Sequence, residues 1–400
     1  MSTKRGREKD EDISKTPGKQ RSSNWDKISQ LCDESCKSQK INEKRSIHNI
    51  HDLYHLALKD SRYMSGCSAL LANKIHVIAN ELKELDELVG IIHIKSTIVK
   101  HILYFVQDFH TNNDNGGEMM HIVIQGPPGV GKTTFANIIG RIYSKLHVIK
   151  KLKKPILWEP QPPSLKKPRK TAPQSQSQPQ SQSNTKENPN FIFVSAKRSD
   201  LIGQYLGSTA IKTQEVINKS LGGVLFIDEA YSLSHQNKDD MYSKECLDTL
   251  NQNLSEKKDQ FLCIIAGYKD EIENCFFKIN PGLRRRFPFV YTIEKYSAED
   301  LLGIFHKMIN NSKWILDKSI NNTEILNFFK EKQECFPNAG GDVELLLFRT
   351  KIEHSTRVFK NIRDKKWVIT LNDIQKGLDS MLQSREIPCP ENTSLPFMYT

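Results

Sequence analysis

One stretch of the chain, HIVIQGPPGVGKTTFANIIG at residues 121–140, limits the possible folds more than any other. It begins with apolar residues typical of a buried strand, continues through a glycine-rich segment, and ends in a pattern that predicts a helix. The segment 126–134 fits G-x-x-x-x-G-K-[ST], which binds phosphate when it lies between a strand and a helix. Inward-facing backbone N–H groups and the positive end of the helix supply the attraction. The sequence therefore predicts a phosphate-binding α/β sheet.

The rest of the chain supports the same fold class. Short, continuous apolar runs typical of buried strands are separated by helical patterns; they read MHIVIQG, NFIFVSA, GGVLFIDEA and FLCIIAGY. This alternation predicts a parallel sheet with helices on both faces. After FPFVYTIEKY strand patterns nearly stop, and Ser297 and Asp300 have capping-box spacing at the start of a helical region. We expect an α/β P-loop domain followed by a small α-helical domain.

Composition divides the chain into five parts. A charged tail is expected at 1–45, a helical segment at 46–83, an α/β domain at 84–296, a helical domain at 297–385 and a short tail at 386–400. Within the α/β domain, a Pro-, Gln-, Ser- and Lys-rich insertion at 150–188 interrupts the strand pattern. Such composition cannot form a packed core. The insertion is therefore expected to leave the sheet at the edge away from the phosphates, as a tether or regulatory arm.

The net charge of +11 is unevenly distributed. Residues 1–45 contain 12 Lys and Arg against 8 Asp and Glu, and residues 145–187 contain 10 against 2, which leaves the remainder at −1. The folded body is thus close to neutral, which does not favour nucleic-acid binding, although the basic tail and insertion could make such contacts. The insertion's KKPRK, at 166–170, fits a nuclear localisation signal, and a solvated linker fits it equally well.

The whole chain contains no run of 18 consecutive apolar residues, and its first residues lack the apolar core of a secretory signal. We therefore expect an intracellular protein, cytoplasmic or alternatively nuclear, with no membrane partner.

Two motifs predict the chemistry. Lys132 of the glycine-rich loop would reach the β- and γ-phosphates, and the Thr133 hydroxyl would bind Mg²⁺. The apolar run GGVLFI ends in two acids. Asp228 would hold Mg²⁺ through water, and Glu229 would polarise the attacking water as general base. Two adjacent carboxylates at the end of a buried strand are costly without a cation, so a site for a nucleotide with Mg²⁺ is expected.

A third motif, NPGLRRRF at 280–287, carries three consecutive arginines. In a ring of subunits, Arg286 or its neighbour Arg285 could reach the γ-phosphate bound to the adjacent subunit. Such an arginine finger raises the rate by roughly 10³- to 10⁵-fold. The alternative is a solvated basic turn.

Together these motifs resemble the AAA+ ATPases of the CbbX and stage V sporulation protein K type, from about Glu84 to Arg385. The resemblance rests on LDELVGI, GPPGVGKTT, SDLIGQYLGSTAIKTQEVI, GGVLFIDEAYSL, IIAGY and NPGLRRRF, in that order. It implies hydrolysis of Mg-ATP at sites between the subunits of a homo-oligomer, which we expect to be a hexamer. The residues that it implies for nucleotide binding are Val89, Gly90, Gly126, Pro127, Pro128, Gly129, Val130, Gly131, Lys132, Thr133 and Thr134.

The resemblance also assigns a role to the loop after the second strand. In such proteins this loop carries an aromatic residue, an aliphatic residue and a glycine into the central pore, where they grip an extended polypeptide. Here those residues are Tyr205, Leu206 and Gly207. Parallel strands deliver their following loops to one edge of the sheet, which agrees with this role. The alternative is that Tyr205 packs beneath its own loop.

Two positions depart from the family pattern. Tyr268 replaces the polar first sensor, usually Asn, and Gly340 in NAGGDVELLLFRTK replaces the arginine of the second sensor, with Arg349 as a candidate substitute.

The leading hypothesis is a motor that remodels an unidentified protein client. One alternative is an AAA+ protein acting on DNA, although the helix and turn before Phe261 leave no room for the β-hairpin of ring helicases. Another is a slow nucleotide switch or scaffold.

Overall fold

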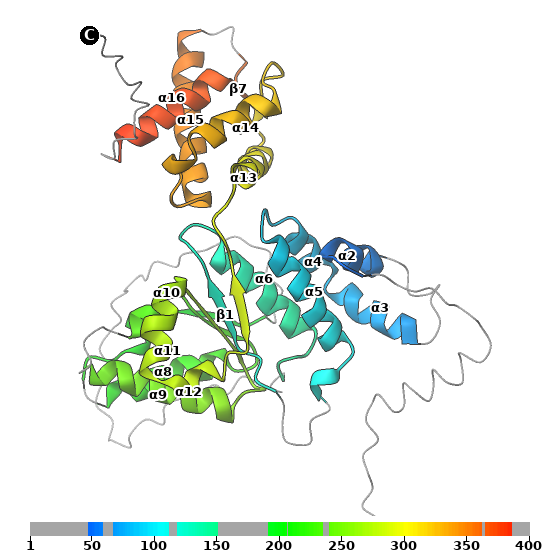
Figure 1. Cartoon of the computed structure of the whole chain (residues 1–400), viewed down its shortest axis with the longest axis vertical. Coiled ribbons are helices and arrows are strands. Elements are labelled where there is room, and N and C mark those ends of the chain that lie inside the picture. Colours follow the sequence, from blue (N-terminus) through cyan, green and yellow to red (C-terminus); the bar gives the residue numbers. More distant parts are fainter. Residues whose placement is uncertain are drawn as a thin grey trace, which may run out of the picture.

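The computed structural model describes residues 47–58, 67–111, 118–150, 191–205, 207–234, 240–361 and 365–385. At its centre lies a five-stranded parallel sheet with the order β2-β3-β4-β1-β5 (Figure 1). This confirms the predicted α/β fold class. The strands span Ile122–Gln125 (β1), Phe193–Ala196 (β2), Val224–Ile227 (β3), Leu262–Gly267 (β4) and Phe289–Thr292 (β5).

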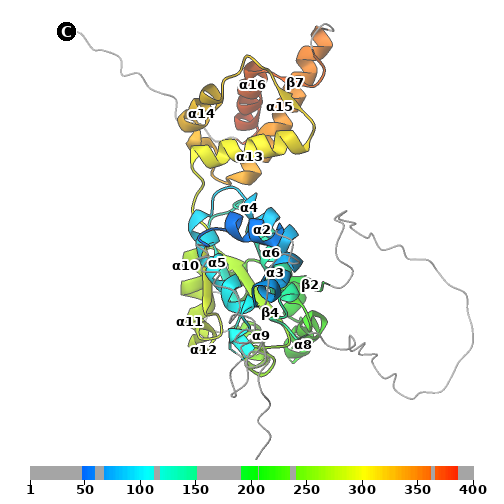
Figure 2. The same ribbon diagram turned by 90° about the vertical axis from the view of Figure 1, so that its right-hand side faces the viewer.

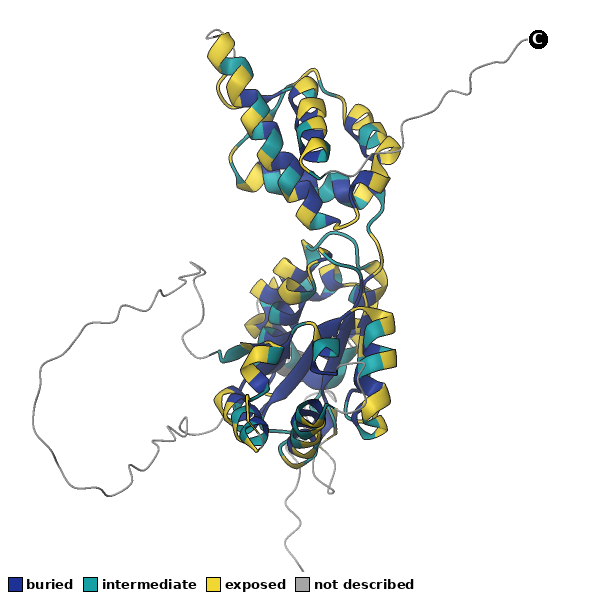
Figure 3. Cartoon of the chain, turned by 90° about the vertical axis from the view of Figure 1, so that its left-hand side faces the viewer, coloured by how far each residue is buried: buried dark blue, intermediate teal, exposed yellow. Residues whose placement is uncertain are grey.

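Helices cover both faces of the sheet, because successive residues of each strand point to opposite sides. Ile122 and Ile124 face one apolar layer and Val123 faces the other. The first layer contains α5 (Ile92–Val106) and α6 (Lys132–Lys145). The second contains α8 (Ser208–Ser220), α9 (Met241–Glu256), a π-helix η4 (Ile272–Phe276), α11 (Phe277–Ile279) and α12 (Pro281–Arg284). Both layers are buried, and the exposed residues lie on the outer faces of the helices (Figure 3).

The amino-terminal helices pack against α5 and α6. They are α2 (Ile50–Leu58), α3 (Cys67–Val77) and α4 (Ala79–Asp86). The carboxylate of Glu81, on α4, is buried and pairs with Lys145 at 2.8 Å and with Arg141 at 3.5 Å, both on α6. Arg141 also pairs with Glu84. A buried carboxylate is stable only when paired in this way, so these ion pairs fix the segment against the sheet's helical layer.

A second, mostly helical body follows β5 and lies at one end of the molecule (Figures 1 and 2). It contains α13 (Ala298–Asn311), α14 (Asn322–Glu331), α15 (Gly340–Lys360) and α16 (Leu371–Gln383). The Ser297 side chain accepts a hydrogen bond from the Asp300 N–H, and the Asp300 carboxylate bonds back, which confirms the predicted capping box. A short parallel pair, β6 (Ile315–Leu316) and β7 (Val368–Ile369), was not predicted, because two residues are too few to show a strand period.

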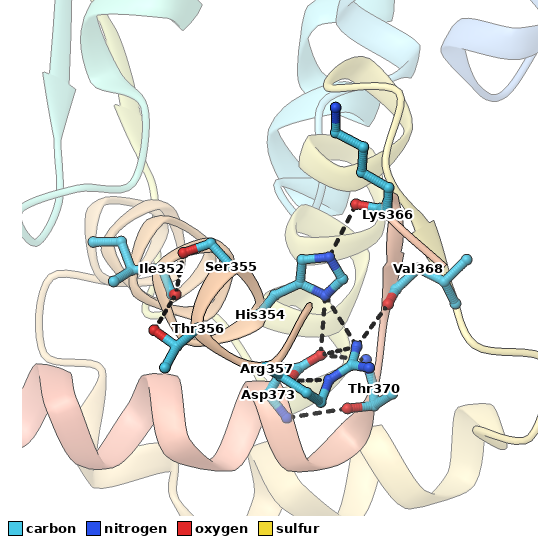
Figure 4. Close-up of polar contacts among 9 residues, drawn as sticks. All are labelled: Ile352, His354, Ser355, Thr356, Arg357, Lys366, Val368, Thr370 and Asp373. Atoms are coloured by element: carbon cyan, nitrogen blue, oxygen red, sulfur yellow. Dashed lines mark hydrogen bonds and ion pairs between the residues drawn. The ribbon is translucent and has the colours of Figure 1, made fainter. Parts of the chain in front are cut away.

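A buried polar cluster ties α15 to α16 in this helical body, which we call the lid (Figure 4). The Arg357 guanidinium donates to both oxygens of Asp373 at 2.9 Å and to the Val368 carbonyl at 3.1 Å. His354 contacts the Asp373 carboxylate at 3.3 Å and the Lys366 carbonyl at 3.0 Å. Because its polar groups are paired, this cluster fixes how the two helices meet.

Several predicted segments lie outside the described residues: the tail 1–45, nearly all of the insertion 150–188, Leu206, and the tail 386–400. At the start of the insertion, the Lys150 N–H donates to the Asp259 carbonyl at 2.8 Å, just before β4. The chain therefore enters the insertion at the amino edge of the sheet. Within the described part of the chain, no helix combines the length and apolar character needed to cross a bilayer.

Candidate functional site

The sheet order brings the predicted motifs to one edge. Strand β1 lies beside β4, with Gln125 opposite Gly267, and β4 lies beside β3. The loops that follow these three parallel strands therefore meet at their carboxyl ends, where ligands bind in open α/β sheets. This edge carries the glycine-rich loop, the acidic pair after β3 and Tyr268 after β4.

The glycine-rich loop adopts the backbone that its glycines allow. Gly129 has a φ of 71° and Gly131 a φ of 79°, in the left-handed region that glycine enters without steric cost. The Gly126 N–H donates to the Gly267 carbonyl at 3.1 Å, which fixes the loop to β4. A Cβ built at Gly131, just before α6, would meet no atom within 4 Å. The space before the helix is therefore open to a ligand, and the helix end favours an anion.

The Lys132 side chain lies against the glycine-rich loop. Its Nζ donates to the carbonyls of Gly126 at 3.0 Å and Pro127 at 2.8 Å, and lies 5.3 Å from the centre of the Tyr268 ring. Burial lowers the pKa of Lys132, whereas the charges of Asp228 and Glu229 act to raise it. A half-buried cation beside two carboxylates and an open helix end fits a nucleotide phosphate with Mg²⁺.

The acidic pair follows β3. Asp228 is half-buried and accepts the Glu229 N–H at 3.0 Å, while Glu229 is exposed. Glu229 has a φ of 49°, a left-handed conformation that costs a non-glycine residue roughly 1–2 kcal/mol. Such strain is concentrated at functional sites, where the surrounding structure maintains it. This strain therefore marks the turn after β3 as a candidate part of the site.

Two aromatic rings stack on each other at this edge of the sheet. Tyr231 and Tyr268 stack with ring centroids 5.5 Å apart and an angle of 25°. Burial raises the pKa of Tyr231 to about 12, and the charge of Glu229 adds to the shift. Tyr268, at the position of the first sensor, thus lies in the site with its ring below Lys132.

A cavity of about 400 Å³ adjoins the loop on its other side. This volume is within the range of roughly 300–1,000 Å³ for small-molecule sites. Mainly apolar side chains line it. Its walls come from the segment before α5, the glycine-rich loop with the start of α6, and the lid, and include Leu88, Val89, Ile91, Val130, Thr134, Met308 and Gly340. Gly90 packs nearby, against the ring of Tyr296.

The lid touches the loop through Gly340. Its N–H donates to the Gly129 carbonyl at 3.1 Å. Arg349 lies nine residues further along α15, about 13 Å along the helix axis at 1.5 Å per residue. Its Nε is buried without a hydrogen-bond partner among the described residues. The structure therefore brings Gly340 to the site and leaves Arg349 away from it.

The three arginines lie at the other edge of the sheet, since α12 precedes β5. Arg284 pairs with Glu273 and lies over the Phe277 ring. Arg286 donates to the Ser255 hydroxyl at 3.0 Å and the Gly282 carbonyl at 2.5 Å. Arg285 is exposed, and no side-chain contact is found for it within the described ranges. The sequence does not decide between Arg286 and Arg285, but the structure gives these two side chains different surroundings.

The loop after β2 leaves the aromatic ring of Tyr205 in solvent, with 74% of the residue exposed. The alternative in which Tyr205 packs beneath its loop is therefore wrong. Its backbone is nevertheless fixed: the Tyr205 N–H donates to the Ser208 hydroxyl at 3.1 Å, which donates back to the Tyr205 carbonyl at 2.6 Å. Gly207 precedes α8 with a φ of 79°. Leu206 lies outside the described residues.

Sequence reasoning missed most of the apolar cavity and both Tyr231 and Tyr296. The signals were weak, because an apolar side chain in a cavity has the same pattern as one in the core. Tyr231 stands three residues after Asp228, so its place beside the acidic pair could have been inferred from the motif. Tyr296 carries no local signal.

Comparison with known proteins gives consistent results. Residues 122–295 match the family described as "ATPase family associated with various cellular activities (AAA)". A CfxQ-like protein of Acanthamoeba polyphaga mimivirus is 36% identical over 305 residues, which cover 76% of this chain and 64% of that protein. Stage V sporulation protein K of Bacillus subtilis is 32% identical over 247 residues, 61% of this chain and 64% of that protein.

A CfxQ homolog of Guillardia theta is 31% identical over 306 residues, covering 74% of this chain and 88% of that protein. Among solved structures, a RuvB mutant of Thermotoga maritima aligns with 74% of this chain and 72% of its own, with a TM-score of 0.45 and 15% identity. The chain thus spans 64% of the length of the first two relatives and most of the third.

Proposed function

Since the chain belongs to the AAA+ ATPases of the CbbX and stage V sporulation protein K type, we propose that it is a ring-forming motor that hydrolyses Mg-ATP to remodel a protein client. One observation carries the proposal. The carboxyl edge of the sheet combines Lys132, whose Nζ rests on the glycine-rich loop, with Asp228 and the strained Glu229. This combination suits phosphoryl transfer to water.

Each residue has a defined task. The backbone N–H groups of the loop and the Lys132 Nζ hold the β- and γ-phosphates. The Thr133 hydroxyl and Asp228 would hold Mg²⁺, which neutralises charge that develops on the phosphates. Glu229, exposed at the end of β3, accepts a proton from the attacking water. The apolar cavity beside Val89 and Val130 takes the adenine ring.

The pore role rests on Tyr205. An aromatic ring left in solvent while its backbone is fixed is suited to gripping another chain. In a ring of subunits, any movement of Tyr205 would be limited to the short loop between Gly203 and Gly207. Leu206 would extend the same grip. The client is a polypeptide of unidentified sequence.

The arginine finger is assigned to Arg285. Arg286 is held by Ser255 and Gly282, and Arg284 is paired with Glu273, so Arg285 is the one of the three whose exposed guanidinium is available to a neighbouring subunit. At a subunit interface, the γ-phosphate of a nucleotide bound to the neighbouring subunit would be the anionic partner of Arg285.

A second candidate is a nucleotide switch with slow turnover. Gly340 at the second-sensor position favours it, since a glycine there has no guanidinium to contact the γ-phosphate. Turnover per subunit distinguishes the two, because a motor hydrolyses ATP continuously and a switch remains in one state. The exposed Glu229 favours the motor.

The solution mass of Glu229→Gln in Mg-ATP tests the proposal. Removing the general base should slow hydrolysis by ~10²-fold or more and trap the ATP-bound state. We expect a mass near that of six subunits by light scattering, with a smaller mass when nucleotide is omitted. A monomer in Mg-ATP would contradict the ring and pore and leave the switch. Ordinary ATP binding by Lys132→Ala would contradict the phosphate site itself.

A further inference from the structure

We propose that Tyr296 and Gly340 are positioning residues that hold two successive carbonyls of the glycine-rich loop outward, so that the following N–H groups face the phosphates. The inference rests on the proposed nucleotide site and adds to it a role for the linker and the lid. It concerns how the site is prepared, and neither residue contacts the reacting atoms.

The first contact orients the peptide between Gly129 and Val130. The Gly340 N–H donates to the Gly129 carbonyl at 3.1 Å. In a planar trans peptide the C=O and the following N–H point in opposite directions. When the lid holds this carbonyl outward, the Val130 N–H must point to the other side, toward the space before α6.

The second contact does the same for the next peptide. The Tyr296 hydroxyl donates to the Val130 carbonyl at 2.9 Å, which turns the Gly131 N–H inward. Burial raises the pKa of Tyr296 to about 12, so the hydroxyl keeps its proton and remains a donor at neutral pH. The ring is held by Gly90, where a Cβ would lie 3.0 Å from Tyr296 Cε1.

The lid can approach this closely only because both partners are glycines. A Cβ on Gly129 would lie 1.7 Å from the Asn338 carbonyl oxygen, and one on Gly340 would lie 2.9 Å from the Gly129 carbonyl oxygen. Any side chain at 340, an arginine included, would push the lid away from the loop. Gly340, which replaces the arginine of the second sensor, thus allows a direct backbone contact between the lid and the glycine-rich loop.

The lid supports this contact from within. The Asn338 N–H donates to the Asp342 carboxylate at 2.6 Å, and Arg385, just after α16, pairs with the same carboxylate. Asp342 is buried. The turn that presents Gly340 is therefore fixed by the packing of the lid.

These contacts would act on the part of the nucleotide that the two N–H groups bind. In P-loops, backbone N–H groups cradle the inner phosphates, which are common to ADP and ATP. Losing one orienting hydrogen bond should weaken both nucleotides by the same factor. A residue that senses the γ-phosphate would instead affect ATP alone.

The test measures dissociation constants for Mg-ADP and a non-hydrolysable Mg-ATP analogue by calorimetry on the full chain. Gly340→Ala is compared with Thr356→Ala, an exposed residue further along the same helix and outside the residues that line the cavity. Tyr296→Phe is compared with Tyr291→Phe, which removes a buried hydroxyl bonded to His101 at 2.7 Å, away from the loop. Thermal unfolding verifies that all four variants fold.

We expect Gly340→Ala and Tyr296→Phe each to weaken both nucleotides about fivefold, the loss of one hydrogen bond, while the two controls bind as the unchanged chain does. Unchanged affinity in Tyr296→Phe and Gly340→Ala, a loss confined to the ATP analogue, or equal losses in the controls would overturn the inference and leave the proposed function intact. If the unchanged chain bound neither nucleotide, the proposed function would fail as well.

Discussion

Tyr205 shows how one residue can be rigid and available at the same time. Its N–H and carbonyl are bonded to the Ser208 side chain, and a Cβ on Gly203 would lie 2.1 Å from the Ser208 hydroxyl, so the turn is closely packed. The ring itself contributes little to the core, since most of it lies in solvent. An exposed aromatic ring at this position is therefore explained better by a partner outside the fold than by stability.

Replacing this ring should separate binding of a client from folding. We expect Tyr205→Ala to change the free energy of unfolding by less than about 0.5 kcal/mol and to keep basal ATPase activity, but to lose stimulation by an unfolded model polypeptide. The measurement is the ATPase rate with and without that polypeptide. Ile211→Ala, on α8 with 64% exposure, is the matched control and should keep the stimulation. An equal loss in both would show that the effect is not specific to Tyr205.

At the scale of elements, the lid depends on the contact between α15 and α16. Asp373 is buried beside Arg357 and His354. Burial alone would raise the pKa of Asp373, but hydrogen bonds from Arg357 and Thr370 outweigh it and lower the pKa below 3.8. The charged carboxylate is thus stabilised in the folded state, and protonating it costs stability.

Asp373→Asn should accordingly destabilise the lid by about 2 kcal/mol near neutral pH, the value of a hydrogen-bonded charge. The contribution of Asp373 is complete above its unfolded pKa of 3.8 and is lost as the pH falls through the lower folded value. The difference in melting temperature between the two proteins should be constant above pH ~4 and shrink below it. Asp379→Asn, exposed on the same helix, should show no such difference at any pH.

The elements differ in how far their sequence predicts them. The strands were predictable because continuous apolar runs reflect burial on both faces of the sheet. The phosphate loop, Gly126 to Thr134, was predictable because all its residues are adjacent in the sequence. The contacts that complete the site join distant residues: Tyr296 and Val130 are 166 positions apart. Local patterns carry no information about such pairs. Arg285 and Arg286 could not be separated for a related reason, since only the turn after α12 decides which one faces solvent.

At the scale of the whole molecule, the sheet separates the two halves of the proposed reaction centre. Lys132 follows the carboxyl end of β1, whereas Arg285 precedes the amino end of β5, which lies beside β1 and runs parallel to it. From residue 286 to residue 292 the extended chain spans about 20 Å. An arginine side chain does not cover this distance, so one subunit cannot supply both groups to one nucleotide.

Mixing two inactive variants tests this division. Lys132→Ala lacks the phosphate contact and Arg285→Ala lacks the finger, so each alone should lose ATPase activity, by roughly 10³-fold or more for the arginine. In an equimolar mixture, an Arg285→Ala subunit can place its intact Lys132 opposite the intact Arg285 of a Lys132→Ala neighbour. Random assembly would then restore roughly one quarter of the interfaces and a corresponding share of the rate.

Arg286→Ala is the control for the mixing experiment. Its side chain bonds Ser255 and Gly282 within the subunit, so its loss should lower the free energy of unfolding by about 1 kcal/mol and leave ATPase activity largely in place. Recovery is expected only where subunits exchange, and should disappear when the two variants are assembled separately before mixing. No recovery after exchange, or an active Arg285→Ala, would place the finger elsewhere. Loss of activity in Arg286→Ala without loss of stability would transfer the role to that neighbour.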